Sequence, residues 1–356
     1  MITGVPEIDY TIIHNKPFVS GLKNIGNTCY MNSCFQILSY TYELTQCLEE
    51  LDIKYNSDIP ETIVLVEWME IKNILWDKKC TISPFKCIAG LRHVAKIKDN
   101  DMFTDGQQND ICEFLLFMLD CFHTSICKPI HMDYQEYLTS MNINHSIISD
   151  KCFKLLQSSY FKHYSDVSNL FYGIQINTIQ QQSDLSILSI NPEIISIIHL
   201  DIPENILQPT LHDCIDLYCN HVLFENENAY FNESKNEYVS ALKSSLFWKL
   251  PHILIFTFNR TKINGRGKNN TLIHFPVQNL DMSKYLILQN NVYEYELYGV
   301  GCHNGGIMGG HYTACVKHND KWYHCNDDKI TQLHNPLQLI NPNVYCLFYR
   351  KTFSSV

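Results

Sequence analysis

A cysteine at position 29 stands in a sequence that can make it a nucleophile. It follows a glycine-punctuated loop over residues 21–28 and precedes apolar residues that recur at helical spacing. This pattern predicts Cys29 at a helix N-terminus, where unpaired N–H groups and the helix dipole favour a thiolate over a thiol. Gly26 can adopt a backbone conformation closed to other residues, and Asn27 and Thr28 can cap the helix. We therefore expect a reactive thiol at Cys29.

Two β-rich segments near the C-terminus offer the proton chemistry that such a thiol needs. His311 follows a glycine-rich stretch at the start of a predicted strand, and Asn326 ends the next predicted strand. Because the two strands are expected to form a hairpin, the Asn326 amide can reach the imidazole and fix its tautomer. Among the 16 histidines of the chain, His318 and His324 are weaker candidates that we expect to face solvent. A cysteine, a histidine and an asparagine thus form a candidate catalytic set.

The elements that must position this set fall into a helical half and a β-rich half. Apolar spacing predicts helices that start at Cys29 and Ile111, and two more over residues 63–76 and 83–91. From residue 169 the pattern changes to shorter, β-rich runs. The predicted strands cover residues 170–178, 194–201, 253–258, 295–302, 312–317, 321–325 and 344–349, and two glycine-containing loops cover 264–270 and 303–310. An active site would lie between the two lobes.

Composition narrows the classes of protein to which the chain can belong. Its 356 residues are 45% hydrophobic, enough to bury a large core. The net charge of −10 argues against sequence-independent nucleic-acid binding, which needs a basic surface. The 15 cysteines include no C-x-x-C pair, which disfavours a disulfide framework and a zinc ribbon. With no apolar run long enough to span a bilayer and no secretory signal over residues 1–9, we expect an intracellular protein of the cytoplasm and also the nucleus, with no membrane or nucleic-acid partner.

The cysteine and histidine segments resemble the two signature boxes of the ubiquitin-specific proteases, a large family of cysteine deubiquitinases. Residues 21–33 resemble the cysteine box, and residues 309–314 together with 322–328 resemble the histidine box. Further matches follow in family order at residues 108–114, 250–255 and 274–276, so that the resemblance extends from about residue 19 to residue 350.

This resemblance implies a fold and a division of the chain. The fold would be α+β, a papain-like cysteine protease fold of the ubiquitin-specific protease type with thumb, palm and fingers. Residues 1–18 would form a short N-terminal extension, and residues 19–352 a single catalytic domain. The helical thumb would cover about residues 19–165, and the fingers and palm about residues 166–352.

The resemblance also assigns catalytic roles. Cys29 takes the position of the nucleophile, His311 that of the base, and Asn326 the third position, where the family has Asp or Asn. Asp327 matches a neighbouring acidic residue that can share the orienting role. Asn24 matches the family's oxyanion-hole side chain, and the backbone N–H of Cys29 would be the second donor to the oxyanion.

The implied substrate is the C-terminal tail of ubiquitin, which has a basic stretch followed by Gly-Gly. Family members hydrolyse the peptide or isopeptide bond after this tail, so the implied partners are ubiquitin and ubiquitinated proteins, with no cofactor. The matched tail-binding positions are Gln108, Asp110, Glu113, His303 and Tyr312. Carboxylates at a helix start can pair with the arginines of such a tail.

One departure from the family concerns a structural zinc ion that many members bind in the fingers through two C-x-x-C pairs. These pairs would fall near residues 178–183 and 232–235, and neither segment contains a cysteine. We therefore predict no metal site. The missing ligands favour an alternative, a catalytically weak ubiquitin-binding module with the same fold, whereas the intact catalytic set argues against it. A hydrolase of a ubiquitin-like modifier is a second alternative.

Overall fold

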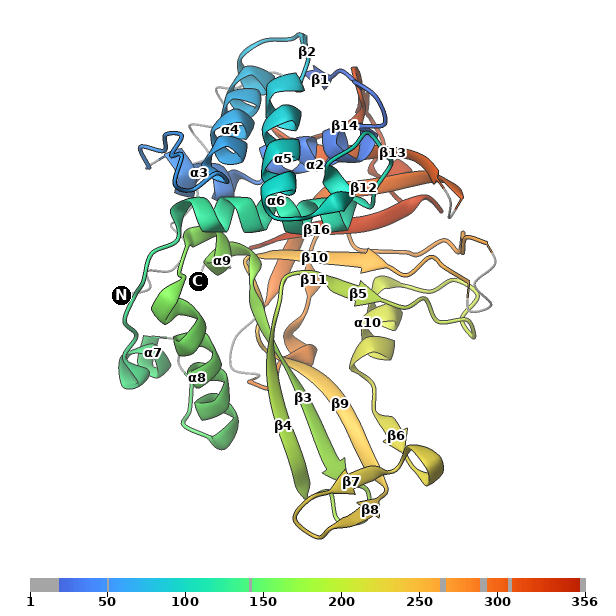
Figure 1. Cartoon of the computed structure of the whole chain (residues 1–356). Helices are drawn as coiled ribbons and strands as arrows, with labels where there is room; N and C mark the ends of the chain where they lie inside the picture. The colour runs from blue at the N-terminus through green and yellow to red at the C-terminus, as the bar shows by residue number, and fades with distance from the viewer. Residues whose placement is uncertain are drawn as a thin grey trace.

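The structure is a computed structural model that describes residues 19–49, 51–140, 143–262, 267–288, 293–306 and 309–352. Helices dominate up to residue 171 and strands dominate afterwards (Figure 1), as the sequence predicts. The expected extension over residues 1–18 lies outside the described residues, as do residues 264–266 of one expected loop. No helix in the described segments combines the length and apolarity that crossing a bilayer requires.

The helical lobe is formed by the first half of the chain. Its helices are α2 (Cys29–Ser39), α3 (Tyr42–Glu49), α4 (Thr62–Asp77), α5 (Phe85–Ile97), α6 (Ile111–Ile126), α7 (Tyr134–Ser140), α8 (Ile147–Lys162) and α9 (Asp166–Phe171), with a 3₁₀ turn at Asp101–Phe103. The four predicted helices are confirmed. The second of the two middle helices extends beyond the predicted end, because Val94 and Ala95 continue its buried face.

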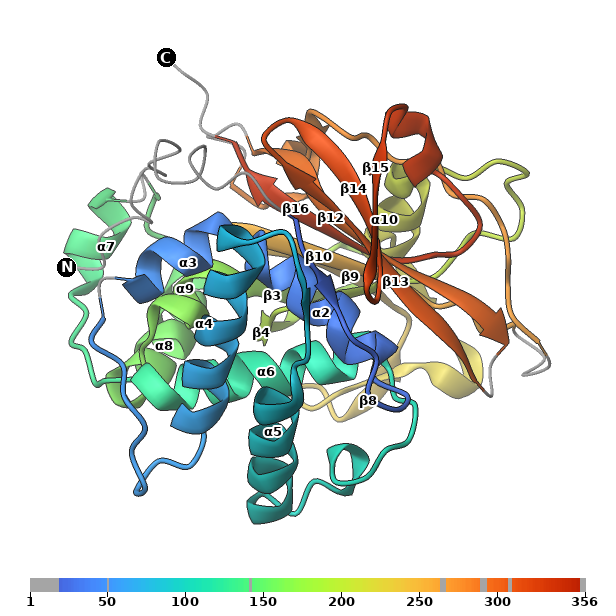
Figure 2. The same cartoon turned by 90° about the horizontal axis from the view of Figure 1, so that it is seen from above.

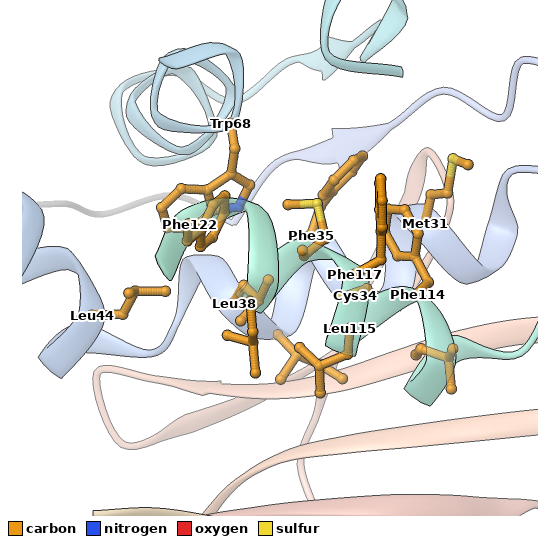
Figure 3. Close-up of a cluster of buried hydrophobic side chains, with 14 of the residues drawn as sticks. Met31, Cys34, Phe35, Leu38, Leu44, Trp68, Phe114, Leu115, Phe117 and Phe122 are labelled. Carbon is orange, nitrogen blue, oxygen red and sulfur yellow. The ribbon is translucent and has the colours of Figure 1, made fainter. Parts of the chain in front are cut away.

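Helix α2 is the central element of this lobe, and every one of its residues is buried. It lies between the other helices of the helical lobe and a large β-sheet (Figure 2). Figure 3 shows the apolar side chains that hold it: Met31, Cys34, Phe35 and Leu38 of α2 with Leu44, Trp68, Phe114, Leu115, Phe117 and Phe122 of the neighbouring helices. Because burying each large apolar side chain contributes roughly 1.5–3 kcal/mol, α2 is a rigid support for Cys29 at its first position.

The large sheet has eight strands in the order β15-β14-β13-β12-β16-β10-β5, with β11 pairing β12. Its strands are β5 (Ile198–Leu200), β10 (Ile253–Phe258), β11 (Leu280–Asp281), β12 (Glu294–Gly306), β13 (Gly309–His318), β14 (Lys321–Asn326), β15 (Lys329–Leu333) and β16 (Val344–Lys351), with short 3₁₀ turns at Ser283–Tyr285 and Pro336–Leu339. The predicted hairpin is confirmed as β13–β14, in which Ala314 lies opposite Cys325.

A second sheet of four strands projects from the large one, in the order β4-β3-β9-β6 (Figure 1). Its strands are β3 (Gly173–Gln181), β4 (Ile187–Ile195), β6 (Val222–Phe224) and β9 (Ala241–Lys249). Helix α10 (Leu211–Cys219) precedes β6. A 3₁₀ turn at Asn226–Asn228 and a separate hairpin of β7 (Tyr230–Asn232) and β8 (Glu237–Val239) lie between β6 and β9 in the chain. The two segments in which zinc ligands would be expected meet here, where Lys235 Nζ donates to Gln181 Oε1 at 3.3 Å. Among the described residues, no group of three or more His, Cys, Asp or Glu side chains is placed to hold a metal ion.

Several predictions about local structure are wrong. The strand predicted over residues 170–178 begins only at Gly173, because Leu170 and Phe171 complete helix α9. The strand predicted over residues 194–201 is divided between the end of β4 and β5. Of the loop predicted over residues 303–310, residues 307–308 lie outside the described residues, and residues 303–306 are strand that pairs with residues 309–312.

His318 is also placed differently from the prediction. It is only 1% exposed, instead of facing solvent, and its Nδ1 lies 2.8 Å from the hydroxyl of Tyr42. Its ring packs against Tyr40 and Tyr42 of the helical lobe. His318 therefore belongs to the contact between the two lobes, which the sequence pattern of a single strand does not reveal.

Candidate active site

The loop before Cys29 is fixed at both of its ends. Strand β1 (Gly21–Leu22) pairs in parallel with β2 (Thr81–Ile82), and Leu22 N donates to the carbonyl oxygen of Asp327 at 2.9 Å. Gly26 has a φ of 108°, which confirms the expected need for glycine. The turn delivers Cys29 to the N-terminus of α2, as predicted.

The side chain of Asn24 organises the interior of this loop. Its Oδ1 accepts hydrogen bonds from Gly26 N at 3.1 Å and from Thr28 N and Oγ1 at 3.3 Å each. Thr28 occupies the N-cap position but makes no side-chain cap; its hydroxyl accepts instead from Ile25 N at 3.1 Å. The prediction that Thr28 caps α2 through its side chain is therefore wrong, because the Thr28 hydroxyl forms its hydrogen bonds with Asn24 and Ile25 instead. With Oδ1 occupied, the Nδ2 group of Asn24 is the part of the side chain that can donate outside the loop.

The residues at the ends of β13 and β14 meet as the sequence predicts. His311 Nε2 lies 2.7 Å from Asn326 Oδ1. Because Asn326 presents an acceptor oxygen, Nε2 carries the proton and Nδ1 keeps a lone pair. The His311 side chain is 41% exposed, so a substrate can reach it.

Cys29 comes close to His311 through the backbone of β13. The backbone N–H of Tyr312, the residue after His311, acts on the Cys29 sulfur and lowers the pKa of its thiol. In the part of the chain that the structure describes, no hydrogen bond joins Cys29 directly to His311. The structure thus brings together Cys29 and the histidine pair across the boundary between the two lobes.

Asp327 connects three parts of the site. Its Oδ2 accepts from Asn24 Nδ2 at 3.0 Å, and its Oδ1 accepts from Asn32 Nδ2 of α2 at 2.8 Å. The distance from Oδ2 to His311 Nε2 is 4.0 Å, longer than a hydrogen bond. Asp327 has a φ of 51°, unusual for a residue other than glycine. The carboxylate therefore orients Asn24 and the start of α2 more directly than it orients the imidazole.

The pKa of the Cys29 thiol is raised, contrary to the expectation of a pre-formed thiolate. Burial raises it most, and the nearby Asp327 carboxylate raises it further. Hydrogen bonds from the backbone N–H groups of Tyr312, Tyr30 and Cys29 itself lower the pKa, but by less. The helix N-terminus acts in the expected direction, and desolvation outweighs it.

This raised pKa predicts how Cys29 will respond to pH. A thiol whose pKa is raised becomes a thiolate only at a higher pH than an ordinary thiol, so the alkylation rate of Cys29 by iodoacetamide should still increase at alkaline pH. Peptide-level mass spectrometry measures this rate, and the exposed Cys80 in the same sample is the reference thiol. A Cys29 rate that is already constant below pH 7 would contradict the prediction.

Asp110 is the most heavily engaged of the five expected tail-binding residues. It is the N-cap of α6, and its Oδ1 accepts from Cys112 N at 2.7 Å and Glu113 N at 3.2 Å. Its Oδ2 accepts from the hydroxyl of Tyr312 at 3.3 Å and from that of Tyr345. Asp110 thus joins α6 to the large sheet beside His311. Tyr345 was not predicted at the site, because only the fold aligns β16 with the start of α6.

The other expected tail-binding residues are found on strands β12 and β13 of the large sheet, just before α6 and on α6. Gln108 Oε1 accepts from Gly310 N at 3.0 Å, and the His303 ring lies 4.5 Å from that of Tyr312. Lys268, which the sequence did not single out, donates to the carbonyl oxygen of His303 and lies 3.4 Å from its Nδ1. Glu113 is exposed on α6. Gln108, Asp110, His303 and Tyr312 are thus brought together next to the His311–Asn326 pair, and Glu113 lies in the first turn of α6, after Asp110.

Comparison with known protein families supports a relationship along the whole described chain. A family model described as ubiquitin carboxyl-terminal hydrolase matches residues 20–349. The chain is 26% identical over 338 residues to ubiquitin carboxyl-terminal hydrolase Usp2 of Drosophila melanogaster, covering 93% of this chain and 35% of that protein. It is also 26% identical over 342 residues to human ubiquitin carboxyl-terminal hydrolase 2, covering 93% of this chain and 55% of that protein. The chain thus spans between a third and just over half of the length of these relatives.

Solved structures show the same fold. The chain is similar to one from the SAGA DUB module of Ubp8, Sgf11, Sus1 and Sgf73 bound to monoubiquitin, with a TM-score of 0.73 and 21% identity, over 99% of this chain and 72% of that one. The same module bound to ubiquitin aldehyde gives a TM-score of 0.72 at 22% identity, with the same coverage. The arrangement of a helical lobe, a large sheet and a projecting sheet is shared with these structures.

Proposed function

Because the chain belongs to the ubiquitin carboxyl-terminal hydrolase family, we propose that it is a thiol-dependent deubiquitinase. It hydrolyses the peptide or isopeptide bond after the C-terminal Gly-Gly of ubiquitin, and its partners are ubiquitin and ubiquitinated proteins. The observation that carries this proposal is the 2.7 Å contact of His311 Nε2 with Asn326 Oδ1, on a strand whose next residue, Tyr312, lowers the pKa of the Cys29 thiol through its backbone N–H. Residues 19–352 act as one catalytic domain, with the thumb over about 19–165 and the fingers and palm over about 166–352.

The proposed reaction starts with a neutral thiol. His311, held by Asn326, removes the proton of Cys29 as the sulfur attacks the carbonyl carbon of the last glycine. Asn24 Nδ2 and the backbone N–H of Cys29 donate to the oxygen that becomes negative, and Asp327 holds Asn24 in place. His311 then protonates the leaving amine, and a thioester forms. A water molecule activated by His311 hydrolyses the thioester and releases ubiquitin.

We assign binding of the ubiquitin tail to Gln108, Asp110, Glu113, His303 and Tyr312. Glu113 is exposed and carries the carboxylate that an arginine of the tail can pair with. Asp110 and Tyr312 are already joined to each other, so they form a preorganised wall. Gln108 bonds the backbone of Gly310, and an incoming tail would exchange this contact for its own hydrogen bonds. The tail-binding region thus combines one accessible charge with fixed polar groups.

A ubiquitin probe with an electrophile at its C-terminus tests the proposal directly. The full chain is incubated with the probe, and covalent labelling is located by peptide mass spectrometry. Labelling at Cys29 supports a deubiquitinase. Binding of ubiquitin without labelling would favour the catalytically weak ubiquitin-binding module. Labelling only by the corresponding probe of a ubiquitin-like modifier would favour a hydrolase of that modifier.

Substituting Asn24 by alanine should lower kcat by about 10²–10³-fold, the usual effect of removing one oxyanion-hole donor. The change removes the amide that Asp327 orients, whereas KM should change little because the tail-binding residues are untouched. Steady-state hydrolysis of ubiquitin with a fluorogenic C-terminal amide measures both constants.

Asn27→Gly is the matched control for Asn24→Ala. It removes an amide from the same loop at a position with a φ of 53°, which glycine adopts readily. Because the Asn27 amide donates to Gly106 O and not to Asp327, kcat should stay near that of the unaltered chain. An equal loss in both variants would show that the loop, and not the Asn24 donor, had been damaged.

A further inference from the structure

Cys302 and Cys315 form a pair of thiols on neighbouring strands. Cys302 on β12 lies opposite Thr313 on β13, so Cys315, two residues further along β13, shares the same face of the sheet. Both belong to the second apolar cluster, in which Cys302 is 8% and Cys315 4% exposed. The Cys315 thiol is therefore a diagonal neighbour of the Cys302 thiol on this face.

Two cationic side chains bond backbone carbonyl oxygens beside Cys302: Arg260 bonds that of Val344, which pairs with Cys302 across the sheet, and Lys268 bonds that of His303. Arg260 is 5% exposed, and its Nε and Nη1 donate to backbone carbonyl oxygens of Val344, Asn269 and Thr271. Its Nη2 is buried and has no hydrogen-bond partner in the described part of the chain. The second cation is Lys268, which donates to the carbonyl oxygen of His303.

These cations have an unusual electrostatic environment. Over the residues that the structure describes, neither Arg260 nor Lys268 makes a salt bridge with a carboxylate. The side chains that could carry a charge opposite to that of Arg260 are the cysteines Cys302 and Cys214, and for Lys268 it is Cys302. A buried cation without a counter-charge is unfavourable, so a negative sulfur at Cys302 would satisfy both side chains.

Cys302 also differs from the other buried cysteines in its acidity. The hydrogen bond from Cys315 lowers its pKa most, and the Asn341 amide, Arg260 and Lys268 lower it further, against the opposing effect of burial. By contrast, burial raises the pKa of Cys214 to about 12 and that of Cys152 to about 12. Cys346 of β16 is a further thiol near Cys302. Its pKa is raised, mainly by Cys112 and by burial, and Cys302 adds to this effect.

We propose that Cys302 is a second reactive thiol of this chain and a site of oxidation by hydrogen peroxide. Its thiolate is held by the charges of Arg260 and Lys268, by Asn341, whose Nδ2 donates to the sulfur at 4.0 Å, and by the neighbouring thiol of Cys315. The sulfur attacks one peroxide oxygen, an S–O bond forms as the O–O bond breaks, and sulfenic acid and hydroxide result. Sulfur is oxidised by two electrons and the peroxide is reduced. The inference does not depend on the proposed deubiquitinase activity.

The experiment compares two cysteines of the same folded chain. The full-length protein is exposed to hydrogen peroxide at neutral pH, the peroxide is removed with catalase, and the protein is denatured in iodoacetamide. Peptide mass spectrometry then gives the remaining thiol at each cysteine. We expect Cys302 to lose its thiol about tenfold faster than the exposed Cys80, since a thiolate reacts and a thiol does not. A Cys302 that reacts as slowly as Cys80, or more slowly, would overturn the proposal.

Two variants test whether the surroundings of Cys302 cause its reactivity. Cys315→Ala removes the thiol donor, and Lys268→Met removes a cation that is less deeply buried than Arg260. Each should slow the oxidation of Cys302 several-fold and leave that of Cys80 unchanged. Circular dichroism verifies that both variants fold. If Cys315→Ala does not fold, Lys268→Met alone still decides the test. Unchanged oxidation of Cys302 in a folded Lys268→Met protein would contradict the proposed electrostatic cause.

Discussion

Replacing Cys29 by alanine is expected to lower kcat/KM for ubiquitin with a C-terminal fluorogenic amide by about 10⁴-fold or more. Alanine has no sulfur to form the thioester, so only the slow reaction with water remains. The variant should still bind ubiquitin, because Cys29 is 2% exposed and offers almost no contact surface. Its free energy of unfolding should change by no more than about 1 kcal/mol, since the rest of α2 keeps its packing. Activity assays, ubiquitin titration and denaturant unfolding measure these three quantities.

Cys34→Ala is the matched control, because Cys34 lies on the same helix and is equally buried. Burial raises the pKa of its thiol well above the usual value, so Cys34 should be unreactive and its loss should leave most of the activity. If both variants lost activity to the same extent, the cause would be damage to α2, and the role of Cys29 as nucleophile would be disproved.

Local sequence patterns predict the elements that bury one continuous face. The apolar spacing of α2, α4 and α6 sufficed because each of these helices packs a full stripe into the core. The expected α+β fold of the ubiquitin-specific protease type is confirmed by the similarity to solved structures. The short helix α9 was missed although Ser165 and Ser168 form a capping box before its apolar residues. The strand pattern that follows concealed this signal.

The tertiary part of the site could not be predicted in the same way. Asp327 accepts hydrogen bonds from Asn24 and Asn32, which are 303 and 295 residues away in the sequence. The predicted hairpin indicates that Asn326 reaches the imidazole, but no periodicity or spacing indicates that the next residue, Asp327, bonds Asn24 and Asn32 instead. Asp327 follows the end of β14 and has a positive φ of 51°, so the strand pattern that places Asn326 does not extend to it.

The acidity of Cys29 also depends on tertiary contacts that the sequence does not reveal. The sequence predicts the local influence, a helix N-terminus that favours the thiolate. The two influences that raise the pKa, burial and the Asp327 carboxylate, arise only when the two lobes meet. The fold therefore makes the thiol of Cys29 depend on a base, which gives His311 a larger role than it would have beside a pre-formed thiolate.

Replacing His311 by alanine is expected to lower kcat/KM by about 10³-fold or more at neutral pH. Because the pKa of Cys29 is raised, the thiol cannot ionise by itself at this pH, and the variant has no group to take its proton. The same reason predicts a second result. Since the thiolate fraction grows as the pH rises through the thiol pKa, the activity of His311→Ala should increase continuously above pH 9. A pH–rate profile of the variant measures both effects, and a profile that is flat between pH 6 and pH 10 would contradict the role of His311 as the base.

His324→Ala provides the matched control for this prediction. His324 lies on β14, next to the strand of His311, and its pKa is lowered by burial and by the proximity of His311. It is a neighbouring imidazole, but it makes no contact with Asn326 comparable to the 2.7 Å bond of His311. The variant should therefore keep the pH–rate profile of the unaltered chain. A profile of His324→Ala that moved to alkaline pH, with His311→Ala unaffected, would transfer the role of base from β13 to β14.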